Sequence, residues 1–140
     1  MILLDTNIIS EMSVTAPAPQ VLAWLNAQQR DDLFLPVPVV AELAAGAADF
    51  ARRTGSLRYS RQLHLVLDDY AARIVDMKRD AAVAFGDVIA RRNAIGRPIM
   101  PIDAMIAAIC LVHGATLATR NVRDFDGLDL RLVNPFEASA

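Results

Sequence analysis

The chain has very little cysteine and no long apolar segment. Cys110 is its one cysteine, which excludes an intrachain disulfide and is typical of a protein from a reducing cytoplasm. No apolar run approaches the roughly 20 residues that span a bilayer, and no basic segment precedes the apolar residues at the start of the sequence. We therefore expect a cytoplasmic protein with no membrane segment and no secretory signal.

Lysine is equally rare. Thirteen of the fourteen basic residues are arginine, the side chain best suited to bidentate phosphate contacts, and several occur in pairs such as Arg91/Arg92 and Arg120/Arg123. The formal net charge of -2 does not by itself indicate a nucleic-acid-binding protein. A genome biased toward arginine codons explains the excess equally well. The arginines alone therefore do not show whether the protein binds nucleic acid.

Apolar residues, in contrast, are abundant. Of the 140 residues, 54% are hydrophobic and 21% are charged, and the mean hydropathy is +0.32. This composition is typical of a compact domain with a large core. Because the sequence contains no internal repeat, low-complexity tract or linker, we expect one domain over residues 1–140.

Short apolar runs alternate with helix-like segments along the chain. Apolar runs bounded by polar or turn residues predict buried strands, at 2–4, 33–37, 74–77, 115–118 and 130–133. Helices are expected at 21–29, 38–53, 59–72, 79–93 and 102–112, with a further helix beginning at Thr6. Pro36 favours an edge or terminal position for its part of the second strand. The alternation predicts an α/β fold with a central parallel sheet and helices on both faces.

Four acidic residues occur where apolar elements begin or end. Asp5 follows the first strand, and Glu42 lies within Val-Val-Ala-Glu-Leu. Asp103 begins an apolar helix, and Asp124 follows Ala-Thr-Arg-Asn. In a doubly wound sheet the carboxyl ends of the strands share one edge, where ligands and metals bind. We therefore expect these four acids to form one catalytic and metal-binding site.

Several carboxylates within contact distance repel one another unless a cation is present. Hard oxygen ligands suit Mg²⁺, with Mn²⁺ as a substitute, rather than zinc. Metal ions paired about 3.5–4 Å apart can activate water and stabilise the leaving oxygen of a phosphodiester. The acids thus predict metal-dependent phosphodiester hydrolysis.

Each acid also has a structural interpretation. Asp5 can cap the helix that follows it, Asp103 can cap the apolar helix, and Asn121 and Asp124 can form an Asx turn. Glu42 differs, because an unpaired carboxylate is expensive to bury among its apolar neighbours. Other side chains capable of chemistry are interpreted as packing residues: Cys110, Met100, Met105 and Trp24.

In this order, the acidic segments resemble those of the PIN-domain ribonucleases, specifically toxins of the VapC type from bacterial toxin–antitoxin pairs. The similarity covers nearly the whole chain. Each matching segment is weak alone, and the ordered set is strong. The segments are Met-Ile-Leu-Leu-Asp-Thr-Asn-Ile-Ile-Ser-Glu at 1–11, Ala-Glu-Leu at 41–43, Asp103 with its Ile-Ala-Ala helix, Ala-Thr-Arg-Asn-Val-Arg-Asp-Phe at 118–125 and the terminal Asn-Pro-Phe.

The resemblance implies a PIN-like three-layer α/β/α sandwich that acts as a Mg²⁺-dependent endoribonuclease. Such toxins are usually homodimers, are inhibited by a small antitoxin of the VapB type, and are commonly associated with tRNA or ribosomal RNA. Asp5, Glu42 and Asp103 match the family's acidic positions directly. Further matched positions are expected to support the acids or to contact RNA: Thr6, Asn7, Thr119 and Asn121 as supporting residues, and Arg120 and Arg123 as RNA contacts.

Two positions depart from the family's pattern. Asn121 stands where a fourth Asp often follows Thr-Arg. Its side-chain carbonyl can bind a metal but adds no charge, so the fourth ligand is either Asn121 or Asp124, with Asp124 expected as the acid. Pro36-Val37-Pro38-Val39 replaces the Ser or Thr often found near the start of the Glu42 helix. We therefore expect that helix to be capped differently.

Other functions fit less well. A receiver domain requires paired acids after the first strand and a late lysine, whereas Thr6 follows Asp5 and Lys78 is the one lysine. A phosphatase of the haloacid-dehalogenase type requires a second Asp where Asn7 stands. The alternative is a PIN scaffold that binds RNA or a protein partner without cutting. The presence of Asp5, Glu42 and Asp103 argues against this alternative.

The segment 21–72 carries more apolar side chains than one sheet face requires. Some of them are expected to form a groove for an apolar antitoxin segment, since large exposed apolar patches mark interfaces. The alternative is that they fill the core of a helix-rich domain. The residues concerned are Trp24, Leu25, Leu43, Phe50, Leu57, Leu63, Leu65 and Leu67.

Overall fold

The computed structural model, which describes residues 1–137, contains a five-stranded parallel sheet with the strand order β3-β2-β1-β4-β5. β1 lies at the centre, where Leu3 pairs with Phe34 of β2 on one side and with Leu117 of β4 on the other. The strands are β1 (Ile2–Leu4), β2 (Leu33–Pro36), β3 (Ile74–Val75), β4 (Thr116–Ala118) and β5 (Arg131–Val133).

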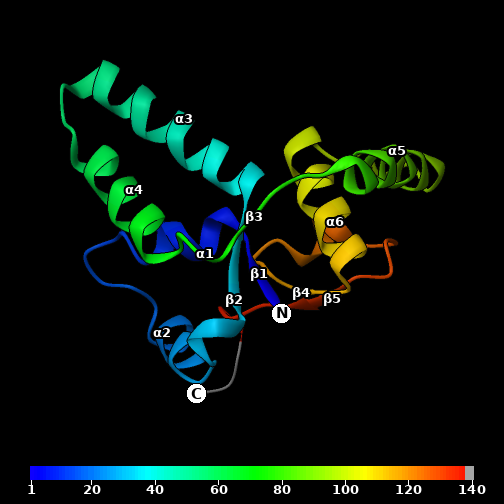
Figure 1. Ribbon diagram of the computed structural model, residues 1–140, viewed down its shortest axis with the longest axis horizontal. Helices are drawn as coiled ribbons and strands as arrows, with labels where there is room; N and C mark the ends of the chain where they lie inside the picture. The colour runs from blue at the N-terminus through cyan, green and yellow to red at the C-terminus, as the bar shows by residue number, and fades with distance from the viewer. Residues whose placement is uncertain (138–140) are drawn as a thin grey trace.

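Helices flank this sheet, which confirms the predicted α/β sandwich with a central parallel sheet. Figure 1 shows the α3–α4 pair and the α5–α6 pair on opposite sides of the strands. None of the helices within residues 1–137 is both long and apolar enough to cross a membrane. The helices are α1 (Thr6–Glu11), α2 (Pro19–Asn26), α3 (Val37–Thr54), α4 (Arg58–Asp69), α5 (Arg79–Ala94) and α6 (Pro101–His113), with 3₁₀ turns η1 (Arg30–Asp32) and η2 (Val122–Phe125).

The predicted strands and helices all form, with ends that differ by at most a few residues. Pro36 is the last residue of β2, so the terminal position expected for it is confirmed. The edge position is wrong, because β2 lies between β1 and β3. A proline is tolerated there because α3 begins at the next residue, with Pro36 as its N-cap.

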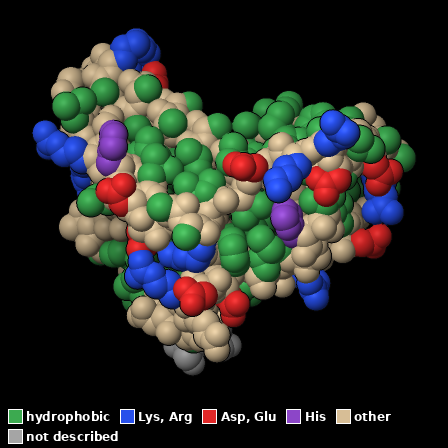
Figure 2. Space-filling view, in the orientation of Figure 1, with side chains coloured by type: hydrophobic (Ala, Val, Ile, Leu, Met, Phe, Trp, Pro, Cys, Tyr) green, Lys and Arg blue, Asp and Glu red, His purple; other side chains and the backbone are tan. Residues whose placement is uncertain are grey.

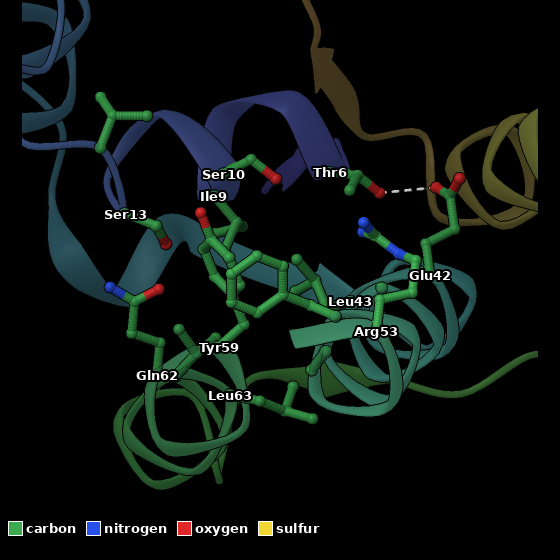
Figure 3. Close-up of a pocket in the computed structure, with 15 residues that line it drawn as sticks. Thr6, Ile9, Ser10, Ser13, Glu42, Leu43, Arg53, Tyr59, Gln62 and Leu63 are labelled. Atoms are coloured by element: carbon green, nitrogen blue, oxygen red, sulfur yellow. Dashed lines mark hydrogen bonds between the residues drawn. The ribbon is translucent and has the colours of Figure 1, made fainter. Parts of the chain in front are cut away.

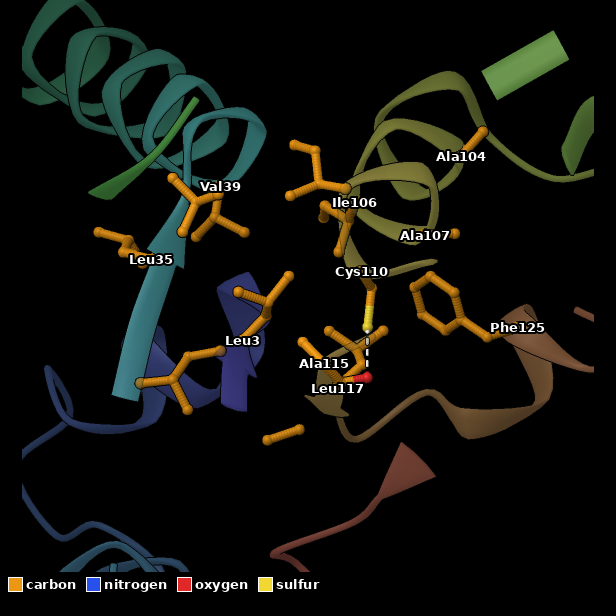
Figure 4. Close-up of a cluster of buried hydrophobic side chains, with 14 of the residues drawn as sticks. Leu3, Leu35, Val39, Ala104, Ile106, Ala107, Cys110, Ala115, Leu117 and Phe125 are labelled. Atoms are coloured by element: carbon orange, nitrogen blue, oxygen red, sulfur yellow. Dashed lines mark hydrogen bonds between the residues drawn. The ribbon is translucent and has the colours of Figure 1, made fainter. Parts of the chain in front are cut away.

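The hydrophobic core lies between the central strands and the helices α3 and α6. Figure 4 shows Leu3 and Leu35 of the sheet facing Val39 of α3 and Ile106 of α6. All four side chains are fully buried. Their burial follows from the continuous apolar runs in the strands, which a sheet covered on both faces requires.

Cys110 is a core residue, as predicted. Its thiol donates a 3.1 Å hydrogen bond to the Ala115 carbonyl, and burial raises the pKa of the thiol to about 12. The packing role predicted for Met100 is wrong: its side chain is 70% exposed, because it precedes the first turn of α6 as the N-cap instead of facing the sheet. Trp24 packs against the core from α2.

Candidate active site

Asp5 lies at the carboxyl end of the central strand and is only 4% exposed. Its backbone N–H donates to the Ala118 carbonyl of β4, 3.0 Å away. One carboxylate oxygen accepts from the Thr6 backbone N–H at 2.7 Å, so Asp5 caps α1, as its structural interpretation predicts. The other oxygen accepts from the Thr119 hydroxyl at 2.7 Å and from the Asn7 side-chain amide at 3.2 Å. Three donors therefore fix this carboxylate in place.

Glu42 reaches the same site from the second turn of α3. Its carboxylate accepts a 2.6 Å hydrogen bond from the Thr6 hydroxyl, the contact drawn as a dashed line in Figure 3. α3 begins without a side-chain cap and carries Pro38 in its first turn, so the different capping expected from Pro36-Val37-Pro38-Val39 is observed. Thr6 thus links the two acids, because its hydroxyl donates to Glu42 and its backbone N–H donates to Asp5.

The supporting residues form a chain of hydrogen bonds around Asp5. Thr119 is fully buried, and its oxygen accepts from the Asn121 backbone N–H at 3.1 Å. The Asn7 side-chain oxygen accepts from the Arg120 backbone N–H at 3.1 Å. These contacts join the turn after β4 to the start of α1, so the predicted supporting residues Thr6, Asn7 and Thr119 all contact the acids directly.

Asp103 is the third residue of α6, where the positive end of the helix dipole favours a carboxylate. The N-cap role expected for it is wrong, because the helix begins earlier, at Pro101, with Met100 as the N-cap. Burial, the largest cause, and the neighbouring charges of Asp5, Asp124 and Glu42 together raise the pKa of Asp103 to about 6. The structure thus brings all four predicted acids within electrostatic reach of one another.

Asp124 lies on η2, the single 3₁₀ turn that follows β4. The turn is closed by a 3.0 Å bond from the Asp124 backbone N–H to the Asn121 carbonyl. Phe125, next in the chain, is 1% exposed and anchors the turn to the core. Asp124 itself is exposed. The acceptor of the hydrogen bond that closes the turn is the main-chain carbonyl of Asn121. The Asx-turn hydrogen bond to its side chain, which the sequence allowed, is not formed.

The two predicted RNA contacts lie on the same turn. The Arg120 guanidinium stacks over the Phe136 ring at 4.7 Å from its centroid. The Arg123 side chain is exposed, and its main-chain carbonyl accepts hydrogen bonds from other arginines. Both residues belong to the segment between β4 and Asp124, and their contact with RNA stays a prediction.

The donor set fits a hydrated divalent cation. Within residues 1–137, none of the four acids forms an ion pair with Arg, Lys or His, although six such pairs occur elsewhere on the surface. The described side chains include no group of three or more His, Cys, Asp or Glu that could hold a metal ion. Mg²⁺ retains several waters and takes one or two carboxylates, so a site of this kind does not require three protein ligands.

A groove adjoins the acids between α1, α3 and α4. Its volume is about 440 Å³, and Thr6 and Glu42 line the end next to the acids. Figure 3 shows Ile9, Leu43 and Leu63 pointing into it, and Figure 2 shows hydrophobic side chains gathered between α3 and α4.

Of the apolar residues of segment 21–72, only some line this groove. Leu43, Phe50 and Leu63 do so, whereas Leu57 and Leu65 are 52% and 68% exposed. The others pack against the core or are half-buried: Trp24, Leu25 and Leu67.

The sequence reasoning missed Arg92. This side chain is 4% exposed and donates hydrogen bonds to the turn that carries Asp124. A signal was present: Ala81, Phe85 and Val88 form an apolar stripe at helical spacing, and Arg92 continues it four residues later. A charged residue on an apolar stripe indicates a buried group with a specific partner.

Comparison with known proteins agrees with this geometry. The PIN domain matches residues 2–129. The chain is 38% identical to the VapC ribonuclease Y4jK of Sinorhizobium fredii, over 98% of this chain and 99% of that protein. It is 32% identical to the Toxin FitB of Neisseria gonorrhoeae, over 97% of this chain and 99% of that protein.

A solved structure is equally similar. The structure of FitAB bound to an IR36 DNA fragment contains a chain that superposes with a TM-score of 0.89 at 31% identity, covering 100% of this chain and 99% of that one. The family pattern, the relatives and the fold all agree with the resemblance that the sequence motifs indicated. The chain belongs to the PIN domain family.

Proposed function

We propose that this protein is a metal-dependent endoribonuclease that acts as the toxin of a toxin–antitoxin pair. The observation that supports the proposal is that the charges of Asp5, Glu42 and Asp124 all act on Asp103. None of the four acids forms an ion pair with a basic residue among residues 1–137. The names of two full-length relatives, a VapC ribonuclease and a toxin, support it.

The four acids are the residues that would hold Mg²⁺ or Mn²⁺. A divalent cation at this site supplies the charge that activates water and stabilises the leaving oxygen of a phosphodiester. Asp5 is already held by three donors, so little reorganisation of its carboxylate is needed. Arg120 and Arg123 at the edge of the site would bind the phosphates of an RNA strand, with tRNA and ribosomal RNA as the expected substrates.

Asp103 has a second property that suits this role. Because burial and three like charges favour its neutral form, the carboxyl retains a proton in slightly acidic solution and releases it near neutral pH. A cation that binds the charged form competes with that proton. Metal binding, and with it cleavage, should therefore strengthen as the pH rises through about 6.

The groove between α1, α3 and α4 is the surface that we propose for the antitoxin. Its apolar lining suits an apolar segment, and the Gln62 side-chain oxygen in its wall is buried without a hydrogen-bond partner, so it offers an acceptor to an incoming donor. Because Thr6 and Glu42 line the same groove, a bound segment would lie against the catalytic acids. Occupation of the groove would then block the site. We also propose a homodimer that works in the cytoplasm.

An RNA cleavage assay tests the catalytic proposal. The wild-type chain should cut single-stranded or looped RNA internally in Mg²⁺, excess chelator should abolish cutting, and Asp103→Asn should remove it. Asp68→Asn is the matched control, because Asp68 is an exposed acid of α4 outside the site. Cleavage that survives in chelator or in Asp103→Asn would disprove metal catalysis. RNA binding without cleavage in any metal would favour the non-catalytic scaffold.

A further inference from the structure

Arg92 is a buried charge without a carboxylate partner. It lies near the end of α5 and is 4% exposed, and within residues 1–137 it forms no ion pair. Its guanidinium donates instead to two main-chain carbonyls, those of Arg123 at 3.4 Å and Asp126 at 2.7 Å. Its Nε has no partner. Burial of an incompletely satisfied guanidinium costs free energy. We therefore expect a role of Arg92 in the segment that its two hydrogen bonds hold.

The two carbonyls belong to residues on either side of Asp124. Arg123 precedes it and Asp126 follows it two positions later. A second guanidinium, from Arg97, reinforces the same contacts: it donates to the Asp126 carboxylate at 3.0 Å and to the Arg123 carbonyl at 3.4 Å. Arg97 is itself tied to Arg92 by a 3.0 Å backbone hydrogen bond. Arg92 and Arg97 thus both bind this short turn on either side of Asp124.

The turn needs these contacts because of the charge that it carries. Asp124 is exposed, and its charge and that of Asp103 repel each other. The backbone of η2 offers little resistance, since it is a single 3₁₀ turn without a side-chain cap. Phe125 holds one side of the turn in the core, but a buried ring alone does not fix the direction of the neighbouring carboxylate.

We propose that Arg92 is a positioning residue of the metal site, which holds η2 so that the Asp124 carboxylate faces Asp103, with Arg97 as its support. The inference rests on the proposed function, because it assigns Arg92 a role only through a metal-binding Asp124. Arg92 touches neither substrate nor metal. Its effect on metal affinity should therefore depend entirely on the presence of Asp124.

Isothermal titration of the full chain with Mn²⁺ alone tests this dependence. We compare the wild type, Asp124→Ala, Arg92→Met and the double variant. Arg92→Met should weaken Mn²⁺ binding about tenfold, the usual effect of removing an outer contact that orients a ligand. In the Asp124→Ala background, the same change should have no further effect, since both substitutions remove one ligand. An equal loss in both backgrounds would show a general structural role and overturn the proposal.

Two exposed arginines complete the test. Arg97→Met removes the second guanidinium from a surface position, so it decides the question if Arg92→Met fails to fold; it should weaken Mn²⁺ binding about threefold in the wild-type background and not in the Asp124→Ala background. Arg91→Met, at the neighbouring position on α5, should leave the affinity unchanged. Unchanged binding in both Arg92→Met and Arg97→Met would overturn the inference alone. A wild-type chain that does not bind Mn²⁺ would overturn the proposed function as well.

Discussion

The Thr119 hydroxyl donates a 2.7 Å hydrogen bond to the Asp5 carboxylate, and both side chains are buried. The bond connects the carboxyl end of β4 to that of β1, the two strands that pair at the centre of the sheet. The same Thr119 oxygen accepts from the Asn121 backbone N–H, so one hydroxyl orients both an acid and the turn beyond it. A hydroxyl is required here, because valine has the shape of threonine but can neither donate to Asp5 nor accept from Asn121.

Thr119→Val should lower the free energy of unfolding by about 1–3 kcal/mol, because a buried carboxylate loses a donor. Urea unfolding in chelator measures the loss without interference from metal. Thr119→Ser, which keeps the hydroxyl, should retain most of the stability. If Thr119→Val is as stable as Thr119→Ser, the hydrogen bond contributes nothing to the fold.

Stability without metal should fall as the pH rises through the range of about 4 to 6. The folded pKa of Asp103 is raised to about 6, chiefly by burial, above the value near 3.9 of an unfolded chain. The native state therefore binds a proton that the unfolded state has released, and this stabilising difference is present at low pH and lost at higher pH. Melting temperatures measured in chelator across this range check the slope, and Asp103→Asn should reduce it.

Millimolar Mg²⁺ should raise the melting temperature at about pH 7.5 and have little effect at about pH 5. A cation that binds only the native state adds stability, but below the Asp103 pKa it must displace a proton. Thermal scans with and without Mg²⁺ at both pH values provide the measurement. An equal effect of Mg²⁺ at both pH values would place its binding away from Asp103.

Asp124→Ala should reduce RNA cleavage at least about tenfold, whereas Asn121→Ala should change it less than about threefold. The Asp124 charge helps to raise the pKa of Asp103, whereas Asn121 contacts its neighbours through its main chain. Initial rates at saturating Mg²⁺ compare the two variants. The reverse order would make Asn121 the fourth ligand.

Gly46→Ala should stabilise the fold by about 0.5–1 kcal/mol, because a helical glycine has excess freedom when unfolded. A Cβ built at Gly46 meets nothing within 4 Å, and Gly46 lines the groove proposed for the antitoxin. Gly86→Ala on α5 is the matched control, with equally open space and no groove. Urea unfolding should show the same gain for both, and a loss at Gly46 would indicate strain in α3.

The alternation of apolar runs was sufficient to predict the sheet and its helices, because strands buried on both faces and helices with one apolar stripe differ in period. The 3₁₀ turns η1 and η2 are too short to have a period, so neither was predicted. The structural alternative for Asp103, a cap of α6, is wrong because Pro101, which is suited to a first helical position, begins the helix two residues before Asp103.

The candidate site was predicted to a similar degree. Residues at strand ends, such as Asp5 and Thr119, could be placed together because parallel strands share one edge. The groove could not be predicted in detail, since it depends on how α1, α3 and α4 are arranged in space, which no local pattern specifies. The burial of Arg92 could have been inferred from the apolar stripe that it continues on α5, but its partners could not, because they are main-chain carbonyls.

The hydrogen bond between Thr119 and Asp5 closes a loop that spans 114 residues, so the site joins the first strand to the fourth. Contacts this far apart form slowly, because the chain must close a long loop before they stabilise it. During synthesis the first strand leaves the ribosome long before its partner exists. A nascent chain therefore lacks this contact, and also Asp124, until residue 124 has been made. Under the proposed function, an emerging chain cannot cut RNA before that point.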